Sequence, residues 1–304
     1  VRILDNLSTG NRLTVNDECE LVVGDMMNSD LVRQCMKGMD GCFHLAAATS
    51  TKQHTSTSVD AHQSNLGGSI NVLDAASIGN TPVVYASSSA VYGDNAVPRL
   101  KEHDRLRPLT AYGVDKLSSE LHARVATVSR GLSTTGLRFF NVYGPGQNPA
   151  LKSSSVVSVF VDRLLRGKTV QVYGDGEQVR DFIYVGDAVN FLRKAMSKGA
   201  NGPDIYNVCT GESISINQLA RSIMSILNVY LPVVHKPARK GDIRGFVGDP
   251  SLAVQCLRVP ARYRLAEGLY RYIKHEQEMD PAFNQSWVNP DSAVIPGLFL
   301  TVNG

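Results

Sequence analysis

Short apolar runs alternate with longer stretches of helical periodicity, and this alternation is the feature that most constrains the fold of the chain. Near-continuous apolar runs are typical of strands that are covered on both faces of a parallel sheet, with crossover helices forming the covering layers. The expected strands are Val1–Leu4, Glu20–Val23, Cys42–Leu45, Val83–Ala86 and Thr135–Phe139, and the expected helices are Ser29–Met36, Asp60–Ser77 and Thr110–Ser129. The sequence therefore predicts an α/β fold with a doubly wound parallel sheet.

After Tyr143-Gly144-Pro145-Gly146 the rhythm changes to shorter and more mixed elements. Here we expect helices over Val156–Leu165, over Ala188–Met196 with Asp187 as N-cap, and from Ser215 or Asn217 through Leu227. The expected strands are Thr169–Tyr173 and Arg180–Tyr184. The pattern predicts a second, smaller mixed α/β domain, followed from about residue 280 by a loosely organised tail.

Composition excludes several classes of function. The 304 residues carry a net charge of only +3 and no dense Lys/Arg run, so nucleic acid is not expected as a partner. No apolar stretch approaches the roughly 20 residues that span a bilayer. The five cysteines are scattered, which favours reduced thiols and a cytoplasmic protein. The seven histidines show no metal-binding spacing, so we expect no metal site.

The segment Tyr112-Gly113-Val114-Asp115-Lys116 is the strongest chemical signal in the chain. Tyr112 and Lys116 lie four apart, which places both side chains on one face of a helix. A lysine ammonium beside a phenol favours the phenolate, which is the form that acts as a base. The alternative is a surface helix that happens to expose a tyrosine and a lysine.

A second signal lies upstream, where a buried-strand pattern ends in Tyr85-Ala86-Ser87-Ser88-Ser89-Ala90-Val91-Tyr92-Gly93. Hydroxyls at the carboxyl end of a strand lie where open α/β sheets bind ligands. A serine there can hydrogen-bond a substrate hydroxyl while a tyrosinate takes its proton. The alternative is a serine-rich loop that caps the segment after it.

Together with Leu137-Arg138-Phe139-Phe140-Asn141-Val142-Tyr143-Gly144-Pro145, these stretches resemble the extended short-chain dehydrogenase/reductase family, most closely its UDP-glucose (UDP-galactose) 4-epimerases and their relatives. The resemblance runs in order from Val1 to about Leu257. It implies a Rossmann-like NAD-binding domain over residues 1–145 and a nucleotide-sugar-binding domain over residues 146–280, with strands exchanged between them, and a tail over residues 281–304. Ser88, Tyr112 and Lys116 match the catalytic residues of the family.

The cofactor implied by the resemblance is NAD. Asp5 ends a strand where a carboxylate accepts hydrogen bonds from the adenosine ribose and repels the extra phosphate of NADP. The other residues implied to bind the cofactor are Asn6, Ser8, Gly10, Asp25, Met26, Leu45, Ala46, Ala47, Asn65, Ser87, Tyr112, Lys116 and Phe140. The glycine-rich phosphate loop of the family, within a βα unit of about 30 residues, would precede Val1, so we expect a longer gene product or a truncated chain.

A UDP-sugar is the substrate that the resemblance implies. The residues implied to bind it are Ser88, Ser89, Tyr112, Asn141, Val156, Gln171, Tyr173, Arg180, Arg239 and Phe246. Arg180 and Arg239 match two arginines that clamp the diphosphate, a task that suits the guanidinium fork. A lone arginine is more often a surface charge.

The absence of an acidic residue in one stretch limits which reaction of the family is expected. Dehydratases and decarboxylases of the family carry a carboxylate in the stretch that corresponds to Ser88–Gly93, and none is present here. This favours 4-epimerisation, which needs no further acid or base. A bulky Phe246 favours UDP-glucose and UDP-galactose over N-acetylated sugars.

Several alternatives stay open. UDP-N-acetylhexosamine and UDP-glucuronate 4-epimerisation, dehydration, and a non-catalytic or truncated nucleotide-binding protein are all compatible with the sequence. The resemblance also implies a homodimer, formed through the Tyr112 helix and the Asp60–Ser77 helix.

Overall fold

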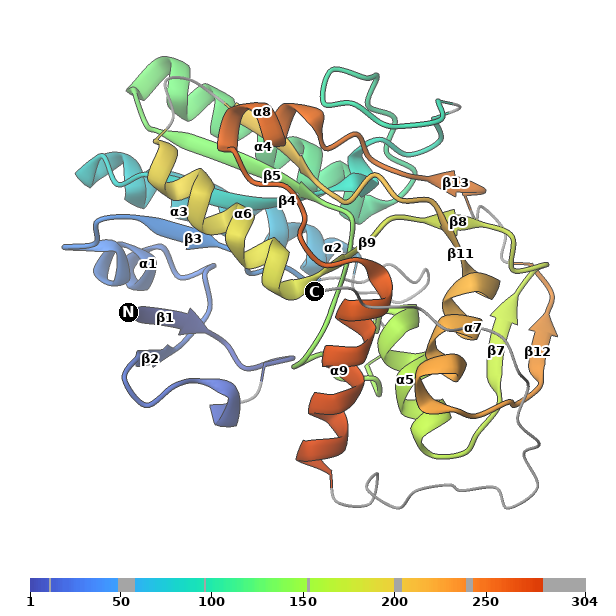
Figure 1. The fold of residues 1–304 in the computed structure, drawn as a ribbon. Helices are drawn as coiled ribbons and strands as arrows, with labels where there is room; N and C mark the ends of the chain where they lie inside the picture. Colours follow the sequence, from blue (N-terminus) through green and yellow to red (C-terminus); the bar gives the residue numbers. More distant parts are fainter. Residues whose placement is uncertain are drawn as a thin grey trace.

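A parallel sheet with helices on both faces forms one half of the protein, and its strands and helices come from both the N-terminal and the C-terminal parts of the chain (Figure 1). The structure is a computed structural model that describes residues 1–10, 12–48, 58–95, 97–151, 154–199, 204–238 and 243–280. The sheet has the order β10-β5-β4-β3, and its strands are β3 (Cys42–His44), β4 (Val83–Ser88), β5 (Thr134–Phe139) and β10 (Asp204–Val208). All three pairings are parallel, so the carboxyl ends of the strands meet at one edge.

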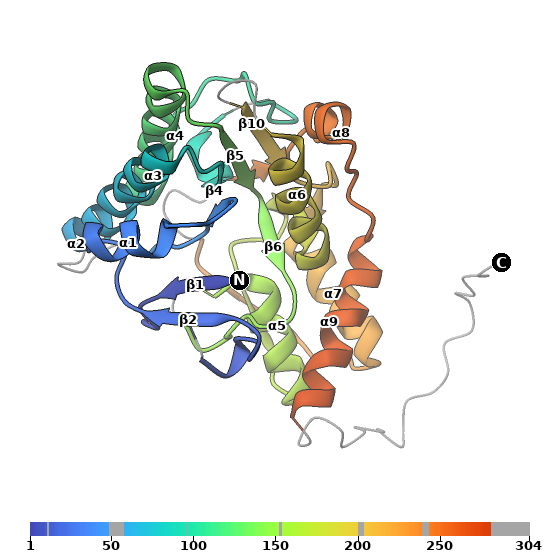
Figure 2. The same ribbon diagram turned by 90° about the vertical axis from the view of Figure 1, so that its left-hand side faces the viewer.

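Helices cover both faces of this sheet (Figure 2). One face carries α1 (Ser29–Met36), α3 (Gly68–Gly79) and α4 (Ala111–Arg130), and the other carries α6 (Val185–Lys198) and α8 (Ser251–Leu257). The strands are buried on both sides, as their apolar composition predicts: Val83, Val84 and Leu137 are at most 2% exposed. The predicted α/β class with a parallel sheet is confirmed.

A second parallel pair, β1 (Arg2–Asp5) and β2 (Glu20–Val23), lies beside this sheet, and a short 3-10 turn, η1 (Arg12–Thr14), lies between them in the chain. Within the described residues β1 pairs only with β2, and β3 only with β4, so no ladder joins the two sheets.

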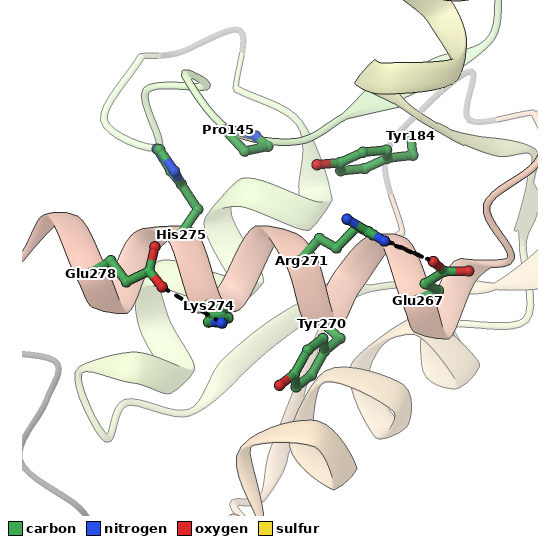
Figure 3. Close-up of a pocket in the computed structure, with 8 residues that line it drawn as sticks. All are labelled: Pro145, Tyr184, Glu267, Tyr270, Arg271, Lys274, His275 and Glu278. Carbon is green, nitrogen blue, oxygen red and sulfur yellow. Dashed lines mark hydrogen bonds and ion pairs between the residues drawn. The ribbon is translucent and has the colours of Figure 1, made fainter. Parts of the chain in front are cut away.

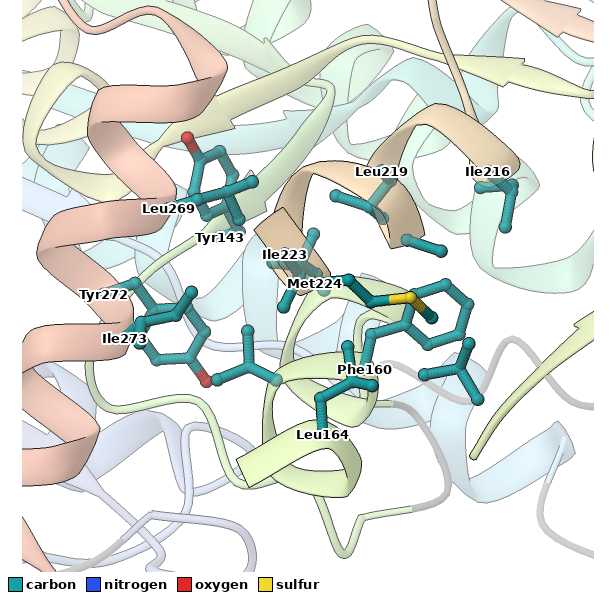
Figure 4. Close-up of a cluster of buried hydrophobic side chains, with 14 of the residues drawn as sticks. Tyr143, Phe160, Leu164, Ile216, Leu219, Ile223, Met224, Leu269, Tyr272 and Ile273 are labelled. Atoms are coloured by element: carbon teal, nitrogen blue, oxygen red, sulfur yellow. The ribbon is translucent and has the colours of Figure 1, made fainter. Parts of the chain in front are cut away.

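The other elements are shorter and mixed. They are α2 (Ser58–His62), η2 (Gln63–Gly67), η3 (Ser89–Val91), β6 (Asn141–Tyr143), α5 (Val156–Leu165), β7 (Val170–Tyr173), β8 (Val179–Arg180), β9 (Phe182–Tyr184), β11 (Ile214–Ser215), α7 (Ile216–Leu227), β12 (Val233–Lys236), β13 (Gly245–Phe246) and α9 (Leu265–Met279). The strand pairs are β6 with β9, β7 with β12, and β8 with both β11 and β13. Packing of α5, α7 and α9 around Phe160, Leu219 and Tyr272 forms the core of this half (Figure 4).

Three sequence expectations need correction. Asp181 divides the expected strand Arg180–Tyr184 into β8 and β9. Helix α6 begins three residues earlier than expected, with Tyr184 as N-cap, and Asp187 is buried inside its first turn, where it accepts hydrogen bonds from the backbone N–H groups of Arg262 and Tyr263. The expected helix Asp60–Ser77 is interrupted by a π-helical turn, η2. Ser215, rather than Asn217, caps α7, in a capping box with Gln218.

Candidate active site

Helix α4 brings Tyr112 and Lys116 to the carboxyl end of β4, and two glycines make the approach possible. Thr110 caps the helix by accepting a hydrogen bond from the Gly113 N–H at 3.0 Å. A Cβ on Gly113 would lie 2.7 Å from the Ala90 carbonyl oxygen, and one on Gly93 would lie 1.6 Å from the Arg107 oxygen. Gly93 also has a positive φ of 57°, a conformation that favours glycine. The glycines that follow Tyr92 and Tyr112 therefore let the two segments pack closely.

Ser88, Tyr112 and Lys116 lie together at this junction. Burial raises the pKa of Tyr112, and a hydrogen bond with Ser88 lowers it. The Lys116 Nζ lies 5.7 Å from the centroid of the Tyr112 ring and donates to the Ala86 carbonyl at 2.7 Å. Burial lowers the pKa of Lys116 to about 8. In the protein alone the net effect on Tyr112 is thus a raised pKa, and Ser88 is the group that opposes it.

The three serines after β4 have different surroundings. Ser88 is partly exposed, and its Oγ accepts a hydrogen bond from the Ala90 N–H at 3.1 Å. Ser87 and Ser89 are buried, and the Ser87 hydroxyl donates to Glu120. Of the three hydroxyls, the one of Ser88 is directed at Tyr112. The predicted assistance from Ser89 and the cofactor contact of Ser87 stay predictions.

Glu120 belongs to a buried ion pair behind the serines. Arg138 on β5 donates to both of its carboxylate oxygens, at 2.9 and 2.8 Å, and both side chains are at most 7% exposed. Arg138 also donates to the Tyr92 hydroxyl at 2.9 Å, and Tyr92 in turn donates to Asn207 at 2.6 Å. This network connects α4 with β4, β5 and β10, so it fixes the helix that carries Tyr112 to the sheet.

A second polar network is formed around Asp115, the residue of α4 that precedes Lys116. The Asp115 carboxylate accepts a hydrogen bond from the Asn65 amide at 3.1 Å and lies 2.5 Å from Nδ1 of His62. The Asn65 side chain also binds the backbone of Ala48, at the end of the turn Leu45–Ala48. It accepts a hydrogen bond from the Ala48 N–H at 2.7 Å and donates one to the Ala48 carbonyl at 3.2 Å. Asn65 was expected near the site, whereas the roles of Asp115 and His62 were not foreseen.

The expected cofactor residues on the first strand pair form a connected group. The Leu7 N–H donates to the Asp5 carboxylate at 2.7 Å, and Asn6 donates to Asp25 at 3.0 Å. The Ser8 N–H donates to the Asn6 side chain at 3.1 Å. A Cβ on Gly10 would lie 3.2 Å from an Asp5 oxygen, so a glycine keeps the space beside this carboxylate open. An acceptor at a strand end beside such an open space fits the adenosine ribose of NAD.

The remaining expected cofactor residues divide into two environments. Met26 is buried and held by α3, because the Asn71 amide donates to its carbonyl at 3.0 Å. Leu45 is 49% exposed in the turn after β3. Ala46 and Ala47 follow it and are exposed and partly exposed, and their small side chains suit close approach of phosphates and ribose. Phe140, in contrast, is 5% exposed and packs against Phe246 with ring centroids 5.8 Å apart.

Apart from Ser88, Ser89 and Tyr112, the expected substrate residues lie between Asn141 and Phe246 in the chain. Gln171 and Tyr173 share the exposed face of β7, whose residues alternate between buried and exposed. Val156 begins α5 and Asn141 begins β6, and both are partly exposed. Arg180 donates to the carbonyl groups of Val179 and Ile243, both at 2.8 Å. Arg239 lies outside the described residues, and Phe246 is 7% exposed beside Tyr92 and Cys209.

Asp181 is a structural residue of the site that sequence reasoning did not single out. Its fully buried carboxylate accepts hydrogen bonds from the backbone N–H groups of Thr210, Gly211 and Gly248 at 2.8, 2.8 and 3.3 Å. Burial raises the pKa of this carboxyl, and these bonds oppose the rise. Asp181 thereby fixes the loop between β8 and β9, and with it the backbone of Asn141, whose N–H donates to the Asp181 carbonyl at 3.0 Å.

A surface cavity of about 590 Å³ lies elsewhere, along α9 (Figure 3). It is lined by Pro145, Tyr184 and α9 side chains that include Arg271, which pairs with Glu267 at 3.2 Å. No expected site residue lines it. Across the described residues no cluster of His, Cys, Asp or Glu is suited to hold a metal, and no helix is long and apolar enough to cross a membrane. All five cysteines are unpaired.

Comparison with known proteins places this arrangement in context. Residues 1–209 match the model of the NAD dependent epimerase/dehydratase family. A putative UDP-glucose 4-epimerase of Methanocaldococcus jannaschii is 32% identical over 277 residues, which cover 90% of this chain and 89% of the relative. A UDP-N-acetyl-alpha-D-glucosaminuronate decarboxylase of Bacillus cytotoxicus is 31% identical over 261 residues, covering 83% and 80% of the two chains.

The solved structures include the UDP-glucose 4-epimerase of Thermotoga maritima with UDP-glucose. It superposes with a TM-score of 0.88 at 30% identity and covers 91% of each chain. This similarity confirms the predicted fold class. The description of the matching family as NAD dependent confirms the prediction of NAD as cofactor.

Proposed function

Because this chain belongs to the NAD dependent epimerase/dehydratase family, we propose that it catalyses the 4-epimerisation of a UDP-hexose, with UDP-glucose and UDP-galactose favoured. The observation that carries the proposal is the junction of Ser88, Tyr112 and Lys116 at the carboxyl end of β4. Relatives named as UDP-glucose 4-epimerases support it. The protein is an enzyme of this family, and what we propose is the particular reaction and the particular sugar.

The proposed roles follow from the chemistry of the three side chains. Tyr112 removes the proton of the sugar C4 hydroxyl and later returns it, and Ser88 holds that hydroxyl through its Oγ. Lys116 supplies positive charge near the phenolate. NAD, when bound, supplies the hydride acceptor and donor for C4. Asp5, Asn6, Ser8, Gly10, Asp25, Met26, Leu45, Ala46, Ala47, Asn65, Ser87 and Phe140 would hold it.

The lack of a further acid distinguishes this reaction from its alternatives. No carboxylate lies between Ser88 and Gly93. Asp115 is the acid nearest to Tyr112 in the sequence, but its side chain is 3% exposed and is engaged by Asn65 and His62. Elimination of water would need an available acid or base at this place. Epimerisation needs only that the 4-keto sugar rotate about its diphosphate linkage. We assign the binding of the diphosphate to Arg180 and Arg239.

The preferred sugar can be determined by measuring turnover of the full-length protein with UDP-glucose, UDP-N-acetylglucosamine and UDP-glucuronate. We expect conversion of UDP-glucose to be the fastest, because Phe246 is bulky and fixed in its cluster.

Tyr112→Phe should lower turnover by about 10²- to 10⁴-fold, the range of general acid–base catalysis, while bound NAD is still released on denaturation. Near-normal turnover in Tyr112→Phe would remove the tyrosine from this role. Release of CO₂ or a 4-keto-6-deoxy product would instead indicate a decarboxylase or a dehydratase.

We also propose that two copies pair through α3 and α4. Val114, Leu121, Val125 and Val128 form an apolar stripe along α4 and are 45% to 73% exposed, and Ile78 on α3 is 76% exposed. The spacing of these residues places them on one side of the helix. Leu121→Glu should convert a dimer into a monomer in sedimentation equilibrium. Val189→Glu, at an exposed valine on α6, is the matched control and should leave the mass unchanged.

A further inference from the structure

The carboxylate of Asp115 is held in an unusual way for a buried acid. Its side chain is 3% exposed, and its partners among the described residues are the neutral amide of Asn65 and the imidazole of His62, which is half exposed. A buried carboxylate is costly unless it is paired and hydrogen-bonded, and the ammonium of the neighbouring Lys116, which interacts with Asp115 through its charge, donates its hydrogen bond to Ala86. Such an arrangement next to Lys116, on the helix that also carries Tyr112, indicates a role other than stability.

Asp115 favours one orientation of the Asn65 amide. Asn65 uses Oδ1 to accept from the Ala48 N–H, and it uses Nδ2 to donate to both the Ala48 carbonyl and Asp115. A flipped amide would point Oδ1 at the Asp115 carboxylate and Nδ2 at the Ala48 N–H, so acceptor would face acceptor and donor would face donor. The negative charge of Asp115 therefore strengthens the preference for the one orientation that binds both backbone groups of Ala48.

The backbone that Asn65 holds belongs to the turn Leu45–Ala48, which contains three of the expected cofactor residues. Asn65 itself is fixed in the π-helical turn η2, where the Ser69 hydroxyl donates to its carbonyl at 2.6 Å. Turns of this kind occur frequently at functional sites. His62, 53 residues from Asp115 in sequence, meets the other carboxylate oxygen from the solvent side.

Asp115 also acts on Lys116, its neighbour in the chain. Burial lowers the pKa of Lys116 to about 8, and the charge of Asp115 opposes this change. The other titratable groups around Lys116 are Tyr112 on α4 and His44 on β3, while His62 on α2 reaches Asp115. Removal of the carboxylate would thus make Lys116 easier to deprotonate.

We propose that Asp115 is a positioning residue that fixes the Asn65 amide, and through it the backbone of the cofactor turn Leu45–Ala48, with His62 closing the network toward solvent. The part that concerns cofactor binding stands on the geometry of the turn. The part that concerns turnover rests on the proposed function, because it acts through Lys116 beside Tyr112.

The test is a double-mutant cycle on NAD binding to the full-length protein, with Asp115→Asn, Asn65→Ala and the double variant. Asp115→Asn removes the charge that favours this amide orientation, so we expect about tenfold weaker NAD binding. Because Asp115 acts through Asn65, it should add nothing in the Asn65→Ala background. Additive losses, or unchanged affinity in Asp115→Asn, would overturn the proposal.

Two further measurements separate positioning from a general structural effect. In the pH–rate profile, Asp115→Asn should move the alkaline limb to lower pH, whereas Asn65→Ala should leave it in place. Asp74→Asn, which removes the exposed ion pair between α3 and α4, is the matched control and should change neither quantity. If Asp115→Asn does not fold, His62→Ala replaces it, with an expected two- to threefold loss (roughly half a kcal/mol) of NAD affinity.

The cycle also distinguishes the two proposals. A wild-type protein that binds NAD but converts no UDP-sugar would refute the proposed reaction and would leave the binding cycle informative. An active wild type with an additive cycle would refute the role of Asp115 and keep the reaction.

Discussion

Helix α4 carries two buried carboxylates, Asp115 and Glu120, in opposite surroundings. Glu120 faces Arg138, which is permanently charged and donates two hydrogen bonds to it. Asp115 faces a neutral amide and a half-exposed imidazole. The first pair fixes the helix to β4 and β5, and the second orients an amide that holds a loop. One helix thus separates the task of anchoring from the task of positioning.

The largest effect that tests this contrast is on stability. Glu120→Gln would leave the Arg138 charge buried and unpaired, and we expect a loss of about 3–5 kcal/mol in the free energy of unfolding, measured by urea denaturation. Asp115→Asn removes no hydrogen-bonded partner of a permanent cation, since Lys116 donates to Ala86, and it should cost about 1–2 kcal/mol. Equal losses in the two variants would remove the distinction between anchor and positioner. Asp74→Asn, at an exposed pair, should stay within about 1 kcal/mol of wild type.

A more gradual effect concerns acid, to which the two networks should respond differently. His44 lies on the Asp115 side, where its Nε2 is 2.9 Å from Ser69 Oγ, and burial, aided by the charge of Lys116, lowers its pKa to about 3. Between pH 6.5 and 3 the unfolded chain therefore binds a proton that the folded one does not. The contribution of His44 to stability is full above this window and falls by up to about 1.4 kcal/mol per pH unit as pH decreases through it.

Replacement of this histidine gives the measurement. His44→Gln should flatten the dependence of the free energy of unfolding on pH between 6.5 and 3, relative to wild type. In hydrogen exchange at pH 5, amides of η2 and α3 should lose protection before those of β4 and β5. An unchanged slope in His44→Gln would show that this imidazole is not kept neutral by the fold.

Local patterns predicted much of the architecture, and long-range contacts account for the rest. The bounds of α1 and α5 follow directly from periodicity and caps at Asn28 and Ser155. The break at Asp181 could not be predicted, because the N–H groups that bind its carboxylate lie 29 to 67 residues away in the chain. Asp187 is a residue type that favours the N-cap position, but its carboxylate instead accepts a hydrogen bond from the backbone N–H of Arg262, 75 residues later in the chain.

The candidate site shows the same division. Tyr112, Lys116 and Ser88 belong to short motifs that a sequence displays, so their proximity was predictable. The links from Asp115 to His62 and Asn65 span 53 and 50 residues, and each member alone resembles an ordinary helical polar residue. The Glu120–Arg138 pair likewise joins α4 to β5. Such networks become visible only when the helices are packed.

Because of the π-helical turn η2, the number of residues in this helical segment determines the directions in which the side chains before and after the turn point. An α-helix turns by about 100° per residue, and one extra residue in a turn rotates everything before it by that amount relative to everything after it. Deletion of a single residue within Gln63–Gly67 would regularise the helix and swing His62 away from Asp115, although every side chain of the network would still be present. This segment should therefore tolerate substitutions better than changes of length, and homologues that differ here by one residue should have lost the His62 contact.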